Sequence, residues 1–246
     1  MDEAAYLSAL RRDSAAMADA AEGNLDARVP GCPDWDVREL VVHTGRVHRF
    51  WHQIAERGLQ APEVARGATL PPDCDDDALL DWFREGAHAL ADLLQEVPGD
   101  RKVWTWAEAD DAGFIKRRMA QETAVHRYDA EQGAVAAQPI ETQLAADGVD
   151  EFVEHMMAAQ RRYGEDLTGA GETVHLHQSD GNGGWGFTLS PDGVKATKGH
   201  PACDSEGKGT ASDLLLVLWR RLPVHTLEIV GDREPLERLV AWPKLD

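Results

Sequence analysis

Apolar residues recur at helical spacing through the first two thirds of the chain. Five such segments lie at residues 3–21, 36–57, 76–97, 114–132 and 141–163. An apolar residue at every third or fourth position is typical of a helix with one buried face. The second segment opens with Asp36 and Glu39, which have the spacing of a capping box, and it should end before Gly58. Consecutive helices of this length favour a helical bundle.

After residue 165 the pattern changes to short apolar runs separated by turn residues. Runs at 173–178, 184–190 and 193–199 indicate the strands of an antiparallel meander. The remaining elements are expected to be a helix at 211–221, a strand at 226–231 and a helix at 234–242. We therefore expect an α+β chain of two domains, with a helical bundle over residues 1–165 and a small α+β domain with an antiparallel sheet over residues 171–246.

Charge and cysteine content indicate which binding partners and which cellular compartment to expect. Among 246 residues, 25 Lys and Arg against 44 Asp and Glu give a net charge of −19. This acidic balance argues against nucleic acids and anionic membranes as partners, because both require a cationic surface, but it leaves room for a local cluster of arginines. The three cysteines form no C-x-x-C pair and the N-terminus has no signal-peptide core, so we expect a cytoplasmic protein. We also expect the protein to act on a small-molecule substrate and to be a monomer or a weak homo-oligomer.

Two of the predicted helices carry metal-ligating residues on their apolar faces. Glu122 and His126 are four residues apart, so they share a helix face, and that face also carries Met119. A carboxylate that points into a core is costly unless it is paired or bound to a cation. On the second helix, His43 lies within the apolar stripe, three residues after Leu40. We therefore expect His43, Glu122 and His126 to meet.

Two imidazoles and one carboxylate with an open fourth position form a pattern typical of catalytic zinc, and one close to the ligand set of non-haem iron. Asp129, three residues after His126, is placed to accept a hydrogen bond from that imidazole. Simpler interpretations remain open at this point. His43 can be a core histidine that is satisfied by hydrogen bonds, and Glu122 with His126 can be an ordinary pair along a helix.

Other candidate residues carry weaker signals. His48 and His52 are also four residues apart, but helical phase places them away from the predicted core. His175 and His177 alternate along one strand, and we interpret them as part of a polar sheet face. Two arginines end the apolar helix of the second domain, where one of them can bind an anionic substrate or complement the helix dipole; they are Arg220 and Arg221.

Three segments together resemble the mycothiol-dependent maleylpyruvate isomerase family of the DinB-like metalloenzymes. Residues 29–50 read VPGCPDWDVRELVVHTGRVHRF and match its P-x-W-x-V-x-x-L-x-x-H opening. Residues 117–131 read RRMAQETAVHRYDAE and are similar to its E-x-x-x-H-R-x-D helix. Residues 211–223 read ASDLLLVLWRRLP and resemble the end of its C-terminal domain. The resemblance covers nearly the whole chain in the right order.

The resemblance implies a divalent metal, usually zinc, bound by His43, Glu122 and His126, with Asp129 at the motif's aspartate. It implies that Arg221 faces a cleft between the domains and binds substrate or cosubstrate. Position 220 departs from the family, since relatives often carry glycine where this chain has Arg220.

The activity implied by the family uses mycothiol as a metal-bound thiolate that isomerises, or is transferred to, a small anionic electrophile. The same scaffold allows two alternatives: a metal-dependent hydrolase and a non-catalytic metal-binding module.

Overall fold

The computed structural model describes residues 1–62, 75–134, 136–163 and 167–245. Contacts divide the chain into two units, residues 1–138 and 139–246, and each is described by itself. Neither Cys32 nor Cys203 forms a disulfide, whereas Cys74 lies outside the described residues. No helix in the described ranges is both long and apolar enough to cross a membrane.

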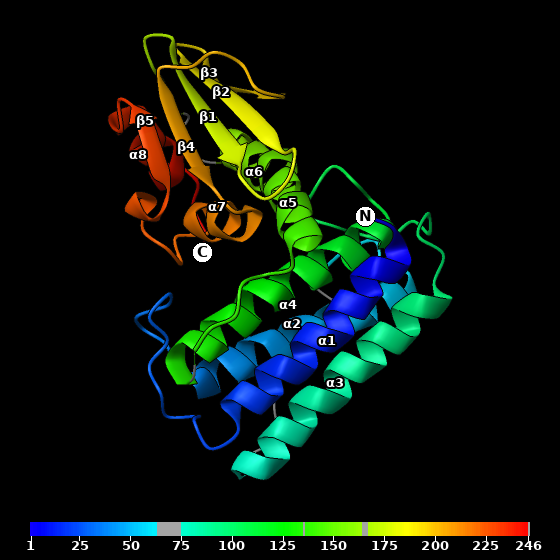
Figure 1. Cartoon of the computed structure of the whole chain (residues 1–246). Coiled ribbons are helices and arrows are strands. Elements are labelled where there is room, and N and C mark those ends of the chain that lie inside the picture. The colour runs from blue at the N-terminus through cyan, green and yellow to red at the C-terminus, as the bar shows by residue number, and fades with distance from the viewer. Residues whose placement is uncertain (63–74, 135, 164–166, 246) are drawn as a thin grey trace. The chain divides into compact units, whose positions relative to one another are not determined.

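The first unit is a bundle of four helices (Figure 1): α1 (Glu3–Ala21), α2 (Val37–Arg57), α3 (Asp76–Glu96) and α4 (Ala112–Ala134). Local sequence sets their ends. The Asp36 side chain accepts a hydrogen bond from the Glu39 backbone N–H, and the Glu39 side chain accepts one from the Asp36 backbone N–H. The expected capping box is therefore present. α2 ends before Gly58, its C-cap, whose φ of 62° lies in the left-handed region that glycine adopts without strain.

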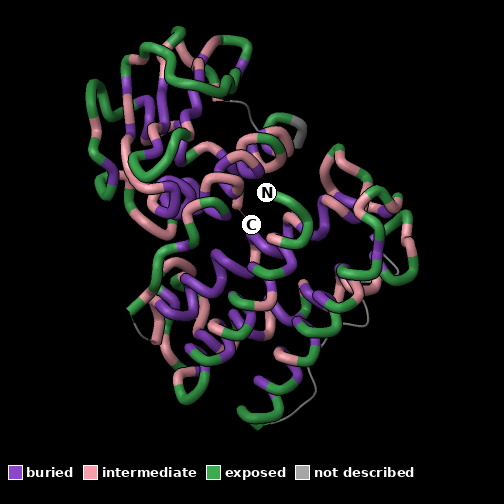
Figure 2. The backbone as a smooth tube through the Cα atoms, turned by 45° about the vertical axis from the view of Figure 1, so that its right-hand side comes forward, coloured by how far each residue is buried: buried purple, intermediate pink, exposed green. Residues whose placement is uncertain are grey.

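The bundle core forms where α1 packs on α4 and α2 packs on α3. Figure 2 shows buried positions inside the bundle and exposed positions along its outer turns. α2 and α3 approach closely at Gly45, where a Cβ atom would lie 2.3 Å from Cζ3 of Trp82. α4 is buried on most of its sides, so it holds polar groups inside the bundle as well as apolar ones.

The second unit begins with a long helical segment, α5 (Thr142–Glu151), the π-helical turn η1 (Phe152–Met156) and α6 (Met157–Tyr163). Its strands are β1 (Glu172–Gln178), β2 (Gly184–Ser190), β3 (Gly193–Lys198), β4 (Ser205–Gly209) and β5 (Glu228–Gly231). The other helices are α7 (Ala211–Leu218), η2 (Val224–Thr226) and α8 (Glu234–Ala241).

The sheet is mixed, so the expectation of a purely antiparallel sheet is wrong in this respect. Its strand order is β3-β2-β1-β4-β5, and β4 pairs with β1 in parallel. After β3 the chain crosses over the sheet and enters β4 on the far side of β1, which gives the two strands the same direction. The sequence analysis missed β4 because its residues, SEGKG, have low strand propensity.

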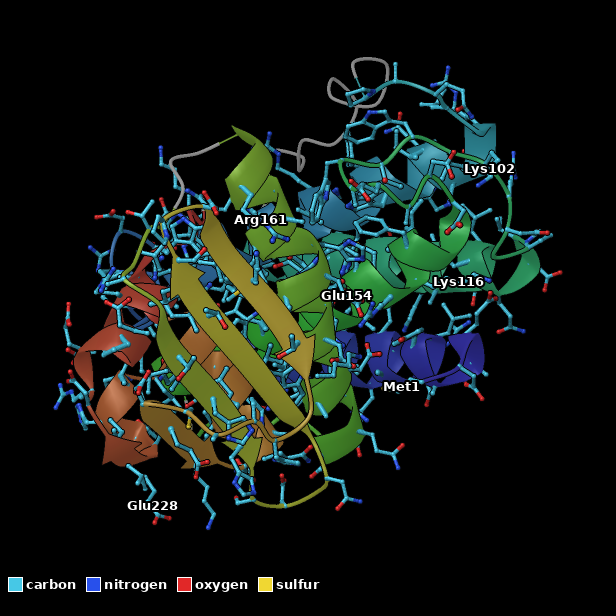
Figure 3. All side chains as sticks on the ribbon, turned by 90° about the horizontal axis from the view of Figure 1, so that it is seen from above. Met1, Lys102, Lys116, Glu154, Arg161 and Glu228 are labelled. Carbon is cyan, nitrogen blue, oxygen red and sulfur yellow. The ribbon has the colours of Figure 1, made fainter. Side chains whose placement is uncertain are left out.

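The division between the units differs from the domain boundary expected near residue 165, a position that itself lies outside the described residues. Helix α5 packs against α7 of the second unit. The Ile140 backbone N–H donates to Ser212 Oγ at 3.0 Å, and Trp185 Nε1–H donates to Asp150 Oδ1 at 2.7 Å. Figure 3 shows Glu154 and Arg161 on the same helical segment, and Arg161 donates to the Val194 carbonyl of β3 at 3.0 Å.

Candidate metal centre

The three residues predicted from helical phase lie together in the first unit. α2 carries His43, and α4 carries Glu122 and His126 one turn apart. Glu122 Oε1 lies 3.4 Å from His43 Nε2 and 3.3 Å from His126 Nε2. His126 is buried, whereas His43 and Glu122 are half-buried. The structure therefore brings the three side chains to one point between α2 and α4.

This donor set and its spacing fit a divalent cation. The ligand atoms of His43, Glu122 and His126 all lie within 4.8 Å of one another. Zinc binds imidazole nitrogen and carboxylate oxygen at about 2.0–2.2 Å, so tetrahedral geometry separates neighbouring donors by about 3.3–3.5 Å. Both separations measured from Glu122 Oε1 fall in that range. Binding of a metal here, and its identity as zinc, stay predictions.

Arg118 fixes the carboxylate of Glu122 and was missed by the sequence analysis. Its Nη2 donates to Glu122 Oε2 at 2.7 Å, which leaves Oε1 directed at the two imidazoles. Burial opposes ionisation of Glu122, but Arg118, His126 and His43 outweigh it and hold its pKa well below the usual value. The available signal was the spacing of four residues between Arg118 and Glu122, which is common on ordinary helices.

Asp129 holds the other end of the His126 ring. The carboxylate is fully buried, and its Oδ2 lies 3.0 Å from His126 Nδ1. This contact favours a proton on Nδ1, so Nε2, which lies on the Glu122 side of the ring, is the nitrogen that remains to bind a metal. Burial lowers the pKa of His126, but Asp129 and Glu122 outweigh it and raise the pKa to about 9. A metal bound at Nε2 therefore competes with a proton.

A pocket of about 710 Å³ opens along α2, and His43 is the member of the trio that lines it. The His43 side chain is 36% exposed against 9% for His126, so the open side of the trio lies at His43. Val47 and Phe50 form part of an apolar wall. A volume of this size suits a small-molecule ligand.

Two further pocket residues received no role in the sequence analysis. The Trp35 ring lies 4.8 Å from the His43 ring between centroids and 6.4 Å from the His126 ring. Arg46 is exposed, lies three residues after His43 and lines the same pocket. Among the described residues Arg46 makes no hydrogen bond or ion pair, so its guanidinium is available to an anionic ligand.

His48 does not face away from the core, so that expectation is wrong. It is 0% exposed, its Nε2 lies 2.9 Å from Thr123 Oγ1, and its ring stacks on Phe83. α2 contacts both α3 and α4, so two of its faces are buried rather than one. Burial lowers the pKa of His48 to about 3, so this imidazole is neutral at pH 7. His52 is half-buried and lies 3.9 Å from Glu56.

The two arginines that follow α7 have different surroundings. Arg220 has a φ of 56°, and its guanidinium donates to the carbonyls of Val240 and Ala241 at the end of α8 and of Pro243 just after it. A left-handed backbone explains why glycine suits this position. Arg221 is half-buried and donates to the Trp219 carbonyl at 2.9 Å. Substrate binding by Arg221 stays a prediction.

Comparisons with known proteins agree with this architecture. The family model of the mycothiol maleylpyruvate isomerase N-terminal domain matches residues 7–131, and the model of the MDMPI C-terminal domain matches residues 143–238. Two solved structures are similar, the mycothiol-dependent maleylpyruvate isomerase and a mutant of it, with TM-scores of 0.56 and 0.55. Each is 11% identical and covers 88% of this chain and 88% of its own. No curated protein matches the chain.

At that identity the solved structures show a shared fold, a helical domain followed by a domain with a sheet. The two family models carry the assignment, because they match the two parts of the chain in order and leave only short segments unmatched. On this evidence the chain belongs to the mycothiol maleylpyruvate isomerase family of enzymes, as the three sequence segments indicated.

Proposed function

We propose that this protein is a metal-dependent enzyme that activates a low-molecular-weight thiol, mycothiol, for isomerisation of or S-transfer to a small anionic electrophile. The observation that carries the proposal is the convergence of His43, Glu122 and His126, of which His43 also lines an open pocket. A divalent cation, zinc in our proposal, would supply the charge that lowers the pKa of a thiol bound beside it. A structural zinc site would instead be closed by four protein ligands.

The protein's own residues prepare this site. Arg118 holds Glu122 and Asp129 holds His126, so two of the three donors are already oriented before a ligand arrives. Val47 and Phe50 give the pocket an apolar wall on the α2 side. An apolar wall lowers the local dielectric constant, so it would strengthen the attraction between a bound cation and a thiolate.

The proposed isomerisation needs no oxidant and no net proton transfer. The thiolate sulfur adds to an activated double bond, and the electron pair moves toward the conjugated carbonyl of the substrate. Rotation about the new single bond follows, and elimination of the thiolate restores the double bond in the trans form. S-transfer uses the same attack, but the new carbon–sulfur bond is retained, and the enolate takes up one proton in place of the one that the thiol released.

An anionic substrate needs a cationic partner near the pocket. We place Arg46 in this role, because it lines the pocket, is exposed and makes no ion pair among the described residues. The family resemblance favours Arg221 for the same role. Arg38 also lines the pocket, but it is held by Asp76 at 2.5 Å and so serves as a matched control.

The first test measures turnover of maleylpyruvate by the zinc-reconstituted protein with and without mycothiol. Turnover should require the thiol, and Glu122→Gln and His126→Ala should each abolish it and lose one metal equivalent per chain. His52→Ala, on the same helix as His43, should retain both. Turnover that persists without thiol would overturn the proposal in favour of a hydrolase that uses metal-activated water. Metal binding without any thiol chemistry on a panel of cis-unsaturated acids would support a non-catalytic module.

The second test assigns the anion-binding residue. Arg46→Gln should raise KM for the anionic substrate at least tenfold while the metal content stays unchanged, and Arg38→Gln should leave KM within about twofold. If Arg221→Ala raises KM and Arg46→Gln does not, the role belongs to Arg221.

A further inference from the structure

A second cluster of histidines lies on the sheet of the second unit, outside the site described above. β1 carries His175 and His177, and the segment after β3 carries His200. The centroids of the three rings lie 5.6, 5.1 and 5.0 Å apart, so each ring contacts the other two. Glu206 on β4 lies beside them. The expectation of an ordinary polar sheet face does not account for this convergence.

Strand register explains how the cluster forms. β1 and β4 are parallel, and their pairing sets His175 opposite Glu206, so both side chains project from one face of the sheet. Successive side chains of a strand alternate between faces, so His177 shares this face with His175. The helices α7 and α8 contact β1 and β4, and the apolar alternate residues of β1, Val174 and Leu176, are buried on the opposite face.

Two glycines on β2 leave room for the segment that carries His200. Gly184 and Gly186 pair with His177 and His175, so they lie on the same sheet face. A Cβ atom at Gly184 would lie 2.7 Å from Cε1 of His200, and a Cβ atom at Gly186 would lie 2.6 Å from Cγ of Pro201. Any larger residue would push this segment away from β1. Figure 1 shows β1 between β2 and β4, which places the cluster in the middle of the sheet.

The polar contacts of the cluster are those of a metal site. Glu206 Oε2 lies 2.8 Å from His175 Nδ1, and Glu206 Oε1 lies 3.6 Å from His177 Nδ1. His175 is 2% exposed, and its Nε2 is buried without a hydrogen-bond partner. A buried nitrogen without a hydrogen-bond partner carries a desolvation cost unless a ligand satisfies it. A carboxylate on the far nitrogen of a ligating histidine is the arrangement that orients such ligands.

We propose that His175, His177 and His200 form a second divalent-cation site, selective for zinc-like metals, with Glu206 positioning the histidines. Their ligand atoms lie within 4.8 Å of one another. Tetrahedral zinc places neighbouring nitrogens about 3.3–3.4 Å apart, so each separation needs a shift of at most about 1.5 Å to complete the site. His200 is exposed and lies outside any strand, so it can make that shift. Three imidazoles suit zinc, nickel and copper better than magnesium or calcium.

A metal held there would tie the segment between β3 and β4 to β1. It would bind the folded second unit and not the unfolded chain, so it would stabilise that unit. Cys203 offers a competing set, because ligand atoms of His175, Cys203 and Glu206 also lie within 4.8 Å of one another. In that set Glu206 would be a ligand instead of a positioning residue. The experiment must therefore separate His200 from Cys203.

The test measures zinc bound per full-length chain after equilibration with zinc and removal of the excess. The starting protein is the double variant His43→Ala/His126→Ala, which isolates the second cluster. It should bind one zinc. Adding His200→Ala should abolish this zinc, and adding His225→Ala, which changes an exposed histidine of the same unit, should retain it. No zinc in the double variant, with circular dichroism showing a folded protein, would overturn the proposal.

Two further readouts do not depend on stoichiometry. Zinc at a hundred times its dissociation constant should raise the Tm of the double variant by about 5–10 °C, and His200→Ala should abolish the shift. Cobalt in place of zinc should give a tetrahedral visible spectrum without a thiolate charge-transfer band, and Cys203→Ser should leave that spectrum unchanged. A thiolate band that disappears in Cys203→Ser would overturn the three-histidine set.

Discussion

Asp129→Asn separates two opposing effects of one buried carboxylate on the predicted metal centre. In the wild type, Asp129 is fully buried and lies 3.0 Å from His126 Nδ1. The substitution keeps the size of the side chain and an oxygen that can accept from Nδ1–H, but it removes the negative charge. That charge makes His126 a stronger ligand for a metal at Nε2, and it also makes His126 a stronger base for a proton.

The magnitudes follow from the site. With a His126 pKa of about 9, a metal at pH 7 must displace a proton, which weakens its apparent affinity about a hundredfold. Asp129→Asn lowers that pKa and so relieves part of this competition at pH 7. Loss of such an orienting carboxylate typically costs about 10–100-fold in intrinsic metal affinity. The two effects therefore largely cancel near pH 7, and the full loss should emerge at or above about pH 9.

The assay is competition for zinc against a chromophoric chelator at pH 7 and near pH 9.5. Both proteins carry His200→Ala, so that the second cluster does not contribute. The expected ratio of wild-type to variant affinity is a few-fold at pH 7 and about 10–100 near pH 9.5. Asp13→Asn, which changes a buried carboxylate that pairs with Arg127 instead of a histidine, should leave the affinity unchanged at both pH values. A ratio that does not change with pH would refute the reasoning.

Three further predictions concern stability. Burial lowers the folded-state pKa of His48 to about 3, below the unfolded value near 6.5, so only the unfolded chain gains this proton between those pH values. The free energy of unfolding should therefore fall by up to about 1.4 kcal/mol per pH unit as the pH drops below 6.5. Urea denaturation of His48→Gln should show a smaller dependence of this free energy on pH. An equal dependence would contradict the lowered pKa of His48. Gly45→Ala forces a Cβ atom toward Trp82 and should destabilise the first unit by about 1–3 kcal/mol in the same assay, whereas a neutral effect would mean that α2 and α3 move apart freely. Arg220→Ala loses the three carbonyl contacts but keeps the left-handed backbone, so it should be less stable than Arg220→Gly by about 1–2 kcal/mol, and the reverse order would exclude backbone strain at this position.

The helices were predictable because their signals are local. The capping box of Asp36 and Glu39 joins residues three apart, and it places the start of α2 correctly. The fourth helix was expected over 114–132 and is observed as Ala112–Ala134, since fraying leaves only its ends ambiguous. Sequence spacing also indicated that His43, Glu122 and His126 point inward, because an apolar stripe fixes the direction of every residue on it.

Contacts between distant segments were harder to predict. Strand β4 exists because β1 offers it a partner, and its glycines serve packing and not strand propensity: a Cβ atom at Gly207 would lie 2.9 Å from Leu236 Cδ2. His48 was misplaced for a related reason. Its helix packs against two neighbouring helices, and a single hydrophobic stripe in the sequence indicates only one of the two buried faces. The other buried face carries a neutral imidazole that is hydrogen-bonded to Thr123, so it does not look apolar in the sequence.

The histidines of the second unit show what strand alternation alone leaves undetermined. Alternation correctly put His175 and His177 on one face, but a shared face is compatible with solvent, a partner or a ligand. The deciding information comes from residues far along the chain: Glu206 reaches the same face through parallel pairing, and His200 reaches it across glycines. In the first site Arg118 pairs with Glu122, and Asp129 pairs with His126. In the second site the Nε2 of His175 is buried without a hydrogen-bond partner. If both proposed sites bind metal, this difference would make the second cluster the more dependent on its cation, and removal of metal should loosen the segment around His200 before it disturbs α4.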